Sequence, residues 1–413
     1  MVRVSIVDVP IKPWDEEVFE AVERSVELLG GPGRFANSGD LVFIKPNILR
    51  GDLAGTTDRR VLYAVVKMFV DEGCDVVVGE NPLVDTNSEE EFERYGVRRL
   101  VERAGGRFID LRRDRHVTVR VKDARGCETL RIAETVLKAD CVVSMPVMKS
   151  HGLCLVTLSL KNMWGTIPPT QRYVGHRKSL NWTLAELNKI VKTKLAIIDG
   201  TTAVGAPPIG PFPLGLIIAG DDPVAADSIA ALRMGYNPYE IEHIRYAHQL
   251  GVGEIDPSKM ELLGAELEAI KRAGETAGRE KFMLQEYAVR PEELLKGVDN
   301  VRLVMGNPCS GCIVKLNLAI KNVGVDKIAK GPEMAFILGP DAEPIPGVVN
   351  LIIGGCLKRY ADEGIFIDFC PVYNQDVESG IRVALGEAES VEQLWDSLLK
   401  SYREKEDESL PGF

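Results

Sequence analysis

LVFIKPNILRGDLAGTTDRRVLYAVVKMFVDEGCDVVVGENP, residues 41–82, contains the pattern that decides the fold. Residues 41–47 are typical of a short apolar strand, residues 59–72 of a helix that ends at Gly73, and residues 74–82 of a second apolar strand. Continuous Val and Ile runs indicate strands buried on both faces, and strands that alternate with helices form parallel layers. The segment therefore predicts an α/β fold with a mostly parallel sheet flanked by helices.

The same alternation continues on both sides of this segment. Further strands are predicted at 2–8, 140–145, 195–200 and 214–223, and further helices at 14–29, 88–104, 183–192 and 223–234. Residues 107–122 alternate in polarity and predict an antiparallel excursion. We expect three parts: an α/β domain for an anion or substrate (1–264), a charged helical connector (265–299) and a smaller α/β domain with a four-cysteine site (300–413).

Composition limits the class of protein. The chain has 413 residues, 45% of them hydrophobic and 27% charged, with a net charge of −11. We find neither an export signal nor an apolar run of about 20 residues, so we expect a cytoplasmic protein without a membrane partner. The acidic balance argues against a nucleic-acid partner, because phosphate backbones require a broad basic surface. The composition is compatible with a homo-oligomer.

Residues 145–178 form a basic island in this acidic chain. They contain five Lys or Arg, two His and no Asp or Glu, whereas a solvated face would mix both signs. This pattern predicts a site for a small anionic substrate; the alternative is a basic surface loop. The predicted substrate-binding residues are Lys45, Asn47, Lys149, Asn162 and Arg172. The predicted catalytic residues are His151 and His176, for proton transfer, and Lys161, as a point charge or a Schiff-base amine.

Polar residues also follow the ends of several predicted strands. They are Lys45, Glu80, Lys149, Asp199 and the pair Asp221 and Asp222. Because ligands of parallel sheets bind outside the carboxyl ends of the strands, we expect these residues to line one crevice. The acidic members are interpreted as a site for a divalent ion such as Mg²⁺: Glu80, Asp199, Asp221, Asp222 and Asp227. The alternative for Asp222 is a helix cap before Pro223.

Four cysteines near the end of the chain form a separate set. Cys309 and Cys312 have C-x-x-C spacing, and Cys356 and Cys370 follow later, the last before Pro371. Four thiolates suit a [4Fe–4S] cluster or a zinc ion, and unliganded or redox-paired thiols are the third interpretation. No P-loop and no strand-following G-x-G-x-x-G occurs, which excludes the usual nucleotide-binding classes.

Several spaced motifs resemble those of domain of unknown function family 362. They are FIKPN (43–47), MPVMKSH (145–151), TLSLKNMWGTIP (157–168), Arg172 with His176, AIIDG (196–200) and DDPVAAD (221–227). Many members of this family are associated with iron–sulfur, ferredoxin-type modules, often with two CxxCxxCxxxCP runs. The resemblance therefore implies an iron–sulfur association, although this chain carries a dispersed cysteine set in place of such runs.

The leading hypothesis is an iron–sulfur protein that is a redox enzyme or an electron-transfer protein. It would act on a small anionic substrate and exchange electrons with a partner protein. One alternative is a non-redox enzyme, such as an isomerase or racemase of hydroxy acids, with a structural zinc or no metal. The other alternative is a non-catalytic carrier of a cluster.

Overall fold

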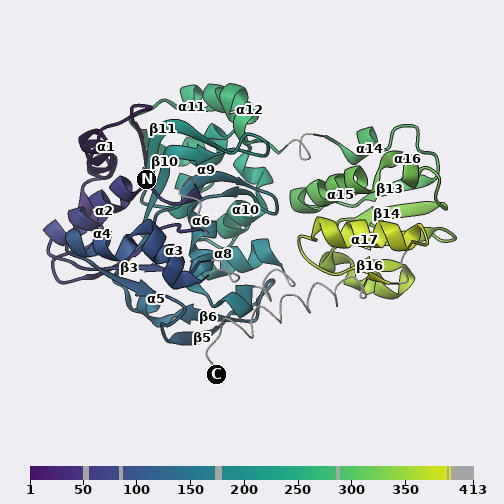
Figure 1. The fold of residues 1–413 in the computed structure, drawn as a ribbon, viewed down its shortest axis with the longest axis horizontal. Coiled ribbons are helices and arrows are strands. Elements are labelled where there is room, and N and C mark those ends of the chain that lie inside the picture. Colours follow the sequence, from purple (N-terminus) through teal and green to yellow (C-terminus); the bar gives the residue numbers. More distant parts are fainter. Residues whose placement is uncertain (50–54, 83–86, 173–178, 285–288, 388–389, 392–413) are drawn as a thin grey trace. The chain divides into compact units, whose positions relative to one another are not determined.

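The computed structural model describes residues 1–49, 55–82, 87–172, 179–284, 289–387 and 390–391. The chain divides into two compact units, one built from residues 1–174 and 181–283 and the other from residues 175–180 and 284–413 (Figure 1). The predicted connector, residues 265–299, is shared between the units, because the division falls between Met283 and Leu284.

The first unit is built on one large sheet. Its strands are β1 (Val2–Asp8), β2 (Leu41–Lys45), β3 (Asp75–Glu80), β4 (Arg107–Asp110), β7 (Cys141–Ser144), β8 (Val147–His151), β9 (Leu155–Thr157), β10 (Leu195–Val204), β11 (Pro211–Gly220) and β12 (Met260–Leu263). Within the described residues these ten strands run in the order β12-β1-β11-β10-β7-β2-β3-β4, while β8 pairs with β10 and β9. Most pairs are parallel, which confirms the predicted α/β class.

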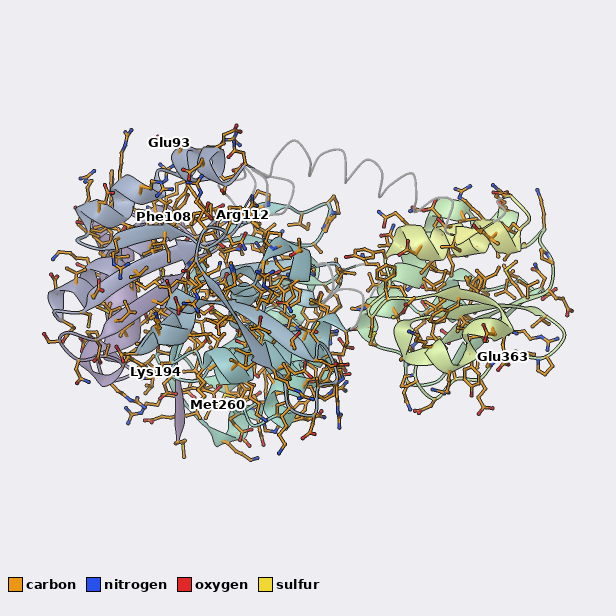
Figure 2. All side chains as sticks on the ribbon, turned by 90° about the horizontal axis from the view of Figure 1, so that it is seen from below. Glu93, Phe108, Arg112, Lys194, Met260 and Glu363 are labelled. Atoms are coloured by element: carbon orange, nitrogen blue, oxygen red, sulfur yellow. The ribbon has the colours of Figure 1, made fainter. Side chains whose placement is uncertain are left out.

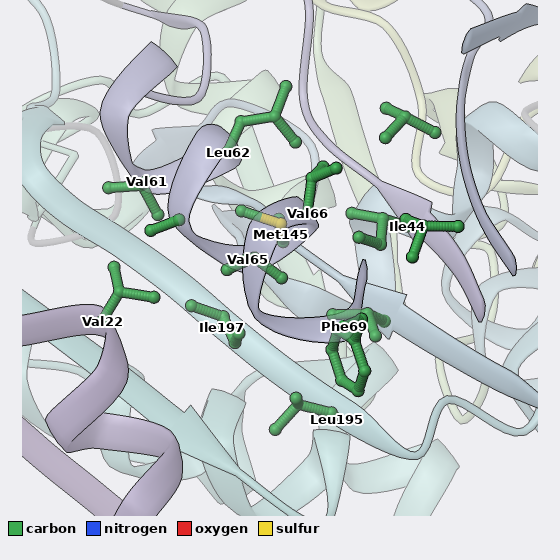
Figure 3. Packing of buried hydrophobic residues seen from close by; sticks show 14 of the residues in the cluster. Val22, Ile44, Val61, Leu62, Val65, Val66, Phe69, Met145, Leu195 and Ile197 are labelled. Carbon is green, nitrogen blue, oxygen red and sulfur yellow. The ribbon is translucent and has the colours of Figure 1, made fainter. Parts of the chain in front are cut away.

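Helices cover this sheet, and α2 shows why they form. The helices are α1 (Asp15–Glu27), η1 (Pro32–Arg34), α2 (Arg59–Asp71), α3 (Ser88–Tyr95), α4 (Val97–Arg103), α5 (Glu134–Lys138), α6 (Ser159–Asn162), η3 (Met163–Thr166), α8 (Leu180–Val191), α9 (Pro223–Arg233), η4 (Pro238–Glu240), α10 (Glu242–Gln249), η5 (Pro257–Lys259), α11 (Leu267–Ala273), η6 (Gly274–Gly278) and α12 (Arg279–Phe282). In α2, Val61, Val65 and Phe69 recur every four residues and therefore share one helical face. They are buried in one cluster with Ile44 and Ile197 of the sheet (Figure 3).

Two predictions about strand direction are wrong. The predicted antiparallel excursion at 107–122 begins with β4, which pairs parallel to β3; only β5 (His116–Arg120) pairs antiparallel, with β6 (Thr129–Ala133). β11 runs antiparallel to β1 and β10. The connection from β10 to β11 is short, and a short connection joins antiparallel strands, whereas a parallel crossover needs a longer one.

The direction of β11 separates residues that were expected to meet. Asp221 follows β11 and therefore lies at the amino edge of the sheet, where its Oδ1 accepts from the backbone N–H of Arg3 at 2.8 Å. Figure 2 shows the two edges: Lys194 and Met260, at the amino edge, lie on the opposite side of the first unit from Arg112, which follows β4.

The second unit is a smaller α/β structure. Its strands are β13 (Val301–Met305), β14 (Met334–Leu338), β15 (Val349–Ile353) and β16 (Ile365–Ile367), all parallel and adjacent in that order among the described residues. Its helices are α14 (Pro291–Leu294), α15 (Ser310–Val323), α16 (Val325–Ile328), η7 (Gly355–Glu363) and α17 (Asn374–Ala384). No helix in the described parts of either unit is both long enough and apolar enough to cross a membrane.

Candidate functional site

A buried ion pair lies at the carboxyl edge of the first sheet. Lys45 ends β2 and Glu80 ends β3, and because these strands are parallel neighbours their last side chains meet. Lys45 Nζ lies 2.5 Å from Glu80 Oε1, and the two side chains are only 1% and 3% exposed. Burial lowers the pKa of Lys45, and the charge of Glu80 opposes that shift. The pair joins a cation to a carboxylate with almost no water around either.

Two arginines converge on the residues that follow β3. Arg172 donates to Asn81 Oδ1 at 2.9 Å and to the Pro82 carbonyl at 2.8 Å. Arg112 donates to the same Asn81 oxygen at 3.0 Å and to the same carbonyl at 3.1 Å. Burial lowers the pKa of Arg172 to about 10; the charge of Glu80 opposes this shift and the charge of Arg112 adds to it. This corner of the site therefore holds two guanidinium groups side by side.

The close approach of α6 and η3 to the ion pair requires a glycine. A Cβ atom at Gly165 would lie 2.7 Å from Lys45 Cε, 2.9 Å from Lys45 Nζ and 3.0 Å from Glu80 Oε1. Real Cβ atoms essentially never come closer than 3.0 Å to another heavy atom. Gly165 thus allows the chain after α6 to lie against the ion pair.

We expect Gly165→Ala to lower the free energy of unfolding by about 1–3 kcal/mol, because the new methyl group displaces a buried ammonium. Urea unfolding of the full chain measures this change. Gly33→Ala is the matched control, since its Cβ would meet only Glu72 Oε2, at 3.6 Å. A Gly165→Ala variant as stable as Gly33→Ala would contradict the packing described here.

The short helix α6 presents Lys161 and Asn162 to this edge. Asp227 on α9 is fully buried, and its two carboxylate oxygens accept from the backbone N–H groups of Ser159 and Leu160 at 2.7 and 2.9 Å. Asn162 donates to the Lys45 carbonyl at 2.7 Å. Burial raises the pKa of Asp227 to about 8, and the two N–H groups oppose the shift. Asp227 is therefore a positioning residue for α6 rather than an ion ligand.

Lys161 differs from Lys45 in its surroundings. It is half-buried, and within the described residues its ammonium group makes no hydrogen bond and no ion pair. Burial lowers the pKa of Lys161, the Cys154 thiol opposes this shift, and the charge of Arg172 adds to it. A lysine in such a place is less easily kept charged than one beside a carboxylate.

His243 on α10 is completely buried, close enough to Lys161 for the lysine charge to act on it. Among the described residues neither of its ring nitrogens has a hydrogen-bond partner. Residues around Lys161 contribute further buried polar atoms without a described partner: Thr157 Oγ1, Ser159 Oγ, Asn162 Oδ1 and Arg172 Nε. Orphaned buried polar atoms are rare in proteins, so a group of them indicates a place where water or a polar ligand binds.

The burial of His243 predicts a pH dependence of stability. Burial, and then the charge of Lys161, lower the pKa of His243 to about 3 from its ordinary 6.5. As pH falls, the unfolded chain therefore takes up a proton on His243 before the folded protein does. The contribution of the neutral imidazole to the free energy of unfolding is complete above pH 6.5 and is lost as pH falls toward 3. The slope is about 1.4 kcal/mol per pH unit. We expect His243→Gln to remove this pH dependence, so that the stability difference from the wild type, measured by urea unfolding between pH 4 and pH 7, shrinks on acidification.

Lys149, Asn47 and His151 lie around the hairpin of β8 and β9. Lys149 Nζ donates to Asn47 Oδ1 and, at 3.3 Å, to the Gly55 carbonyl. His151 Nδ1 accepts from the backbone N–H groups of Leu153 and Cys154 at 3.1 and 3.2 Å. In these contacts His151 closes the hairpin turn, while its proposed proton transfer remains a prediction. His176 lies outside the described residues.

The acidic residues do not form one group. Asp221 pairs with Arg34 at the amino edge, and Asp222 caps α9 by accepting from Val224 N at 2.8 Å. Asp199 lies inside β10, where it accepts from Asp58 N at 2.7 Å and from the Thr201 hydroxyl at 2.6 Å. Within the described residues no three His, Cys, Asp or Glu side chains have a metal-binding arrangement. The expected crevice with Asp221 and Asp222 in its wall is therefore wrong, because β11 is antiparallel.

The four late cysteines gather at one edge of the second sheet. Cys309, Cys356 and Cys370 follow the carboxyl ends of the parallel strands β13, β15 and β16, and Cys312 lies in the first turn of α15. A hydrogen bond from the Cys312 thiol to Cys309, then burial, then the charges of Cys309 and Cys370, raise the pKa of Cys312. A Cβ atom on Gly354 would lie 3.4 Å from Cys356 Sγ and 3.8 Å from Cys312 Sγ. The donor set thus suits a thiolate-ligated group, although the described thiols are not in metal-binding geometry.

Two residues of the first site were missed in the sequence. Arg112 follows β4 directly. If residues 107–110 had been assigned to the parallel sheet, Arg112 would have been predicted with the other polar residues that follow the carboxyl ends of parallel strands. His243 carries no local signal, because its burial depends on the packing of α10 against α9, which residues distant in sequence bring about.

Comparison with known proteins gives a match to a family model over part of the chain, and no reaction. Residues 42–232 match the family model described as "Domain of unknown function (DUF362)". The chain is 27% identical over 249 residues to thylakoid-associated protein sll1697 of Synechocystis sp., a match that covers 57% of this chain and 75% of that protein. Among solved structures, the lactate racemase apoprotein of Thermoanaerobacterium thermosaccharolyticum matches with a TM-score of 0.33 and 10% identity, over 60% of this chain and 56% of that one. A TM-score this low carries no argument about activity.

Proposed function

We propose that the first unit binds a small anionic substrate at the carboxyl edge of its sheet, and that the second unit holds an iron–sulfur cluster. The protein would then be a redox enzyme or an electron-transfer protein. The observation that carries the anion site is its buried charge. Within the described residues, two carboxylates, Glu80 and Asp110, face four cations, and Arg172 interacts with each of the other three: Lys45, Arg112 and Lys161.

This excess of positive charge needs a counter-ion. Buried charges persist in proteins when they are paired, and an anion that replaces water here gains charge-assisted hydrogen bonds. Among the described contacts Glu80 is occupied by Lys45 and by the backbone N–H groups of Ile48 and Asn81, so it does not neutralise the arginines directly. A planar carboxylate suits a guanidinium group best, because both offer two parallel contacts.

The anion site is tested by titrating the full chain with oxalate, lactate, pyruvate and inorganic phosphate, using calorimetry and thermal unfolding. We expect Arg172→Gln to weaken the affinity for the best ligand about 10- to 100-fold, as loss of a hydrogen bond to a charged group implies. Arg113→Gln is the control, because Arg113 is adjacent in sequence to Arg112 but 73% exposed. Equal affinities for all three proteins would refute the site.

The cluster proposal is supported by the placement of four thiols at one sheet edge. Cys309, Cys312, Cys356 and Cys370 would hold the cluster, with Cys309 and Cys312 at the start of α15, whose N-terminal N–H groups favour thiolate. A bound [4Fe–4S] cluster would supply one-electron transfer. The strands below these residues are buried in the apolar core of the second unit, which supports the positions of the thiols.

Anaerobic purification with iron and sulfide analysis tests the cluster. We expect iron and sulfide in the wild type and in Cys74→Ser, and their loss in the double variant Cys309→Ser with Cys312→Ser. Colourless protein with stoichiometric zinc would end the redox proposal. Substrate turnover that survives loss of the cluster would favour the non-redox alternative, an isomerase or racemase of hydroxy acids.

A further inference from the structure

The two lysines of the anion site have opposite surroundings. Lys45 is 1% exposed and touches Glu80 and the Pro46 carbonyl, so its proton is held in place by a carboxylate. Lys161 is half-buried, and within the described residues no acceptor contacts its nitrogen. One lysine is therefore a structural cation, while the other is a half-buried amine without a described counter-ion.

Burial favours the neutral form of Lys161, and the charge of Arg172 adds to this effect, whereas the Cys154 thiol opposes it. The His243 imidazole, which burial keeps uncharged, is a further neighbour. None of them is a carboxylate, and the guanidinium repels a second positive charge. A lysine that is desolvated and placed beside another cation loses its proton more easily and becomes a nucleophile.

The position of the amine is also well defined. Asp227 holds the backbone of α6 through Ser159 and Leu160, and Asn162 ties the next residue to the Lys45 carbonyl. Lys161 lies between these anchors. Several buried polar atoms around it have no described partner, among them Ser159 Oγ and Asn162 Oδ1, which gives a polar ligand groups to bind.

We propose that Lys161 is a nucleophilic amine that forms an imine with a small 2-oxo carboxylate, whose carboxylate is held by Arg172. The lysine nitrogen attacks the carbonyl carbon, a C–N bond forms, and the carbonyl oxygen takes up protons and leaves as water. The product is a C=N double bond, and no oxidant or reductant takes part. This inference rests on the proposed anion site and specifies its substrate class.

The test is trapping of the imine in the full-length protein. Pyruvate and sodium cyanoborohydride are added near pH 7, and the modified residue is identified by peptide mass mapping. We expect one reduced adduct on Lys161, none on the buried Lys45, and competition by oxalate, which has no ketone. Lys161→Arg keeps the positive charge and removes the nucleophilic amine, so it is expected to lose the adduct, whereas the exposed control Arg113→Gln is expected to keep it.

The outcomes separate this inference from the anion site. Oxalate binding without an adduct on Lys161 above that on exposed lysines overturns the imine and leaves the anion site standing. Absence of both binding and adduct overturns both. The trapping rate provides a second measurement: its dependence on pH is expected to reach half-maximum below the range of an ordinary lysine. A midpoint in the ordinary lysine range would also overturn the proposal.

Discussion

Lys45→Met is expected to lower the free energy of unfolding by about 3–5 kcal/mol, the range for a buried ion pair that loses one partner. Methionine fills nearly the same volume, so the change isolates the charge. It leaves the Glu80 carboxylate buried, with only the backbone N–H groups of Ile48 and Asn81 as its remaining described partners, at 2.8 and 2.7 Å. Urea unfolding of the full chain provides the measurement.

The double variant Lys45→Met with Glu80→Gln distinguishes charge from packing. We expect it to be more stable than Lys45→Met alone, because no uncompensated charge remains in the core. Lys67→Met is the control, since its ion pair with Asp71 is exposed on α2 and contributes little. A Lys45→Met variant within about 0.5 kcal/mol of the wild type, as is usual for surface changes, would show that the pair does not stabilise the fold.

Asp227→Ala has the second largest expected effect, because it acts on both stability and the candidate site. It removes the acceptor of two buried backbone N–H groups, on Ser159 and Leu160, and each unsatisfied group costs about 1–3 kcal/mol. We therefore expect a loss of about 2–5 kcal/mol. The helix that carries Lys161 would lose its anchor, so anion affinity should fall as well.

Ser228→Ala is the matched control for Asp227→Ala. Ser228 is the next residue on α9 and equally buried, but its hydroxyl donates only to the Val224 carbonyl at 2.7 Å. We expect that variant to keep anion binding and most of its stability. If Asp227→Ala unfolds no more easily than Ser228→Ala, the anchoring of α6 by the carboxylate is refuted. If it loses stability yet binds anions normally, Asp227 stabilises the fold without positioning the site.

The residues at the strand ends were the part of the site that the sequence predicted best. Apolar runs that stop at Lys45 and Glu80 predict two strands, and helices between strands predict that these run parallel. Parallel neighbours end at the same edge, which brings the two side chains together. The same rule would have found Arg112, whose strand was misread as antiparallel because its alternating polarity resembles that of β5.

The helix caps could also be predicted from the sequence. Asp222 before Pro223 predicts the start of α9, and its carboxylate does accept from Val224 N and Ala225 N. Capping involves residues two or three positions apart, so it is written into a short stretch of chain. The sequence did not predict that Asp222 lies at the opposite edge of the sheet from Lys45, because that position depends on the direction of β11.

By itself, the sequence determined most of the helices and strands, their alternation, the parallel core of the first sheet and the basic character of residues 145–178, because periodicity and capping act over a few neighbouring residues. Only the tertiary structure decided that β11 is antiparallel, which places Asp221 at the edge of the sheet opposite Lys45. It also decided that Asp227 anchors α6 and that His243 is buried near Lys161. These outcomes depend on contacts between residues far apart in the chain. Such contacts also decide that Lys45 is paired with a carboxylate and that Lys161 is not.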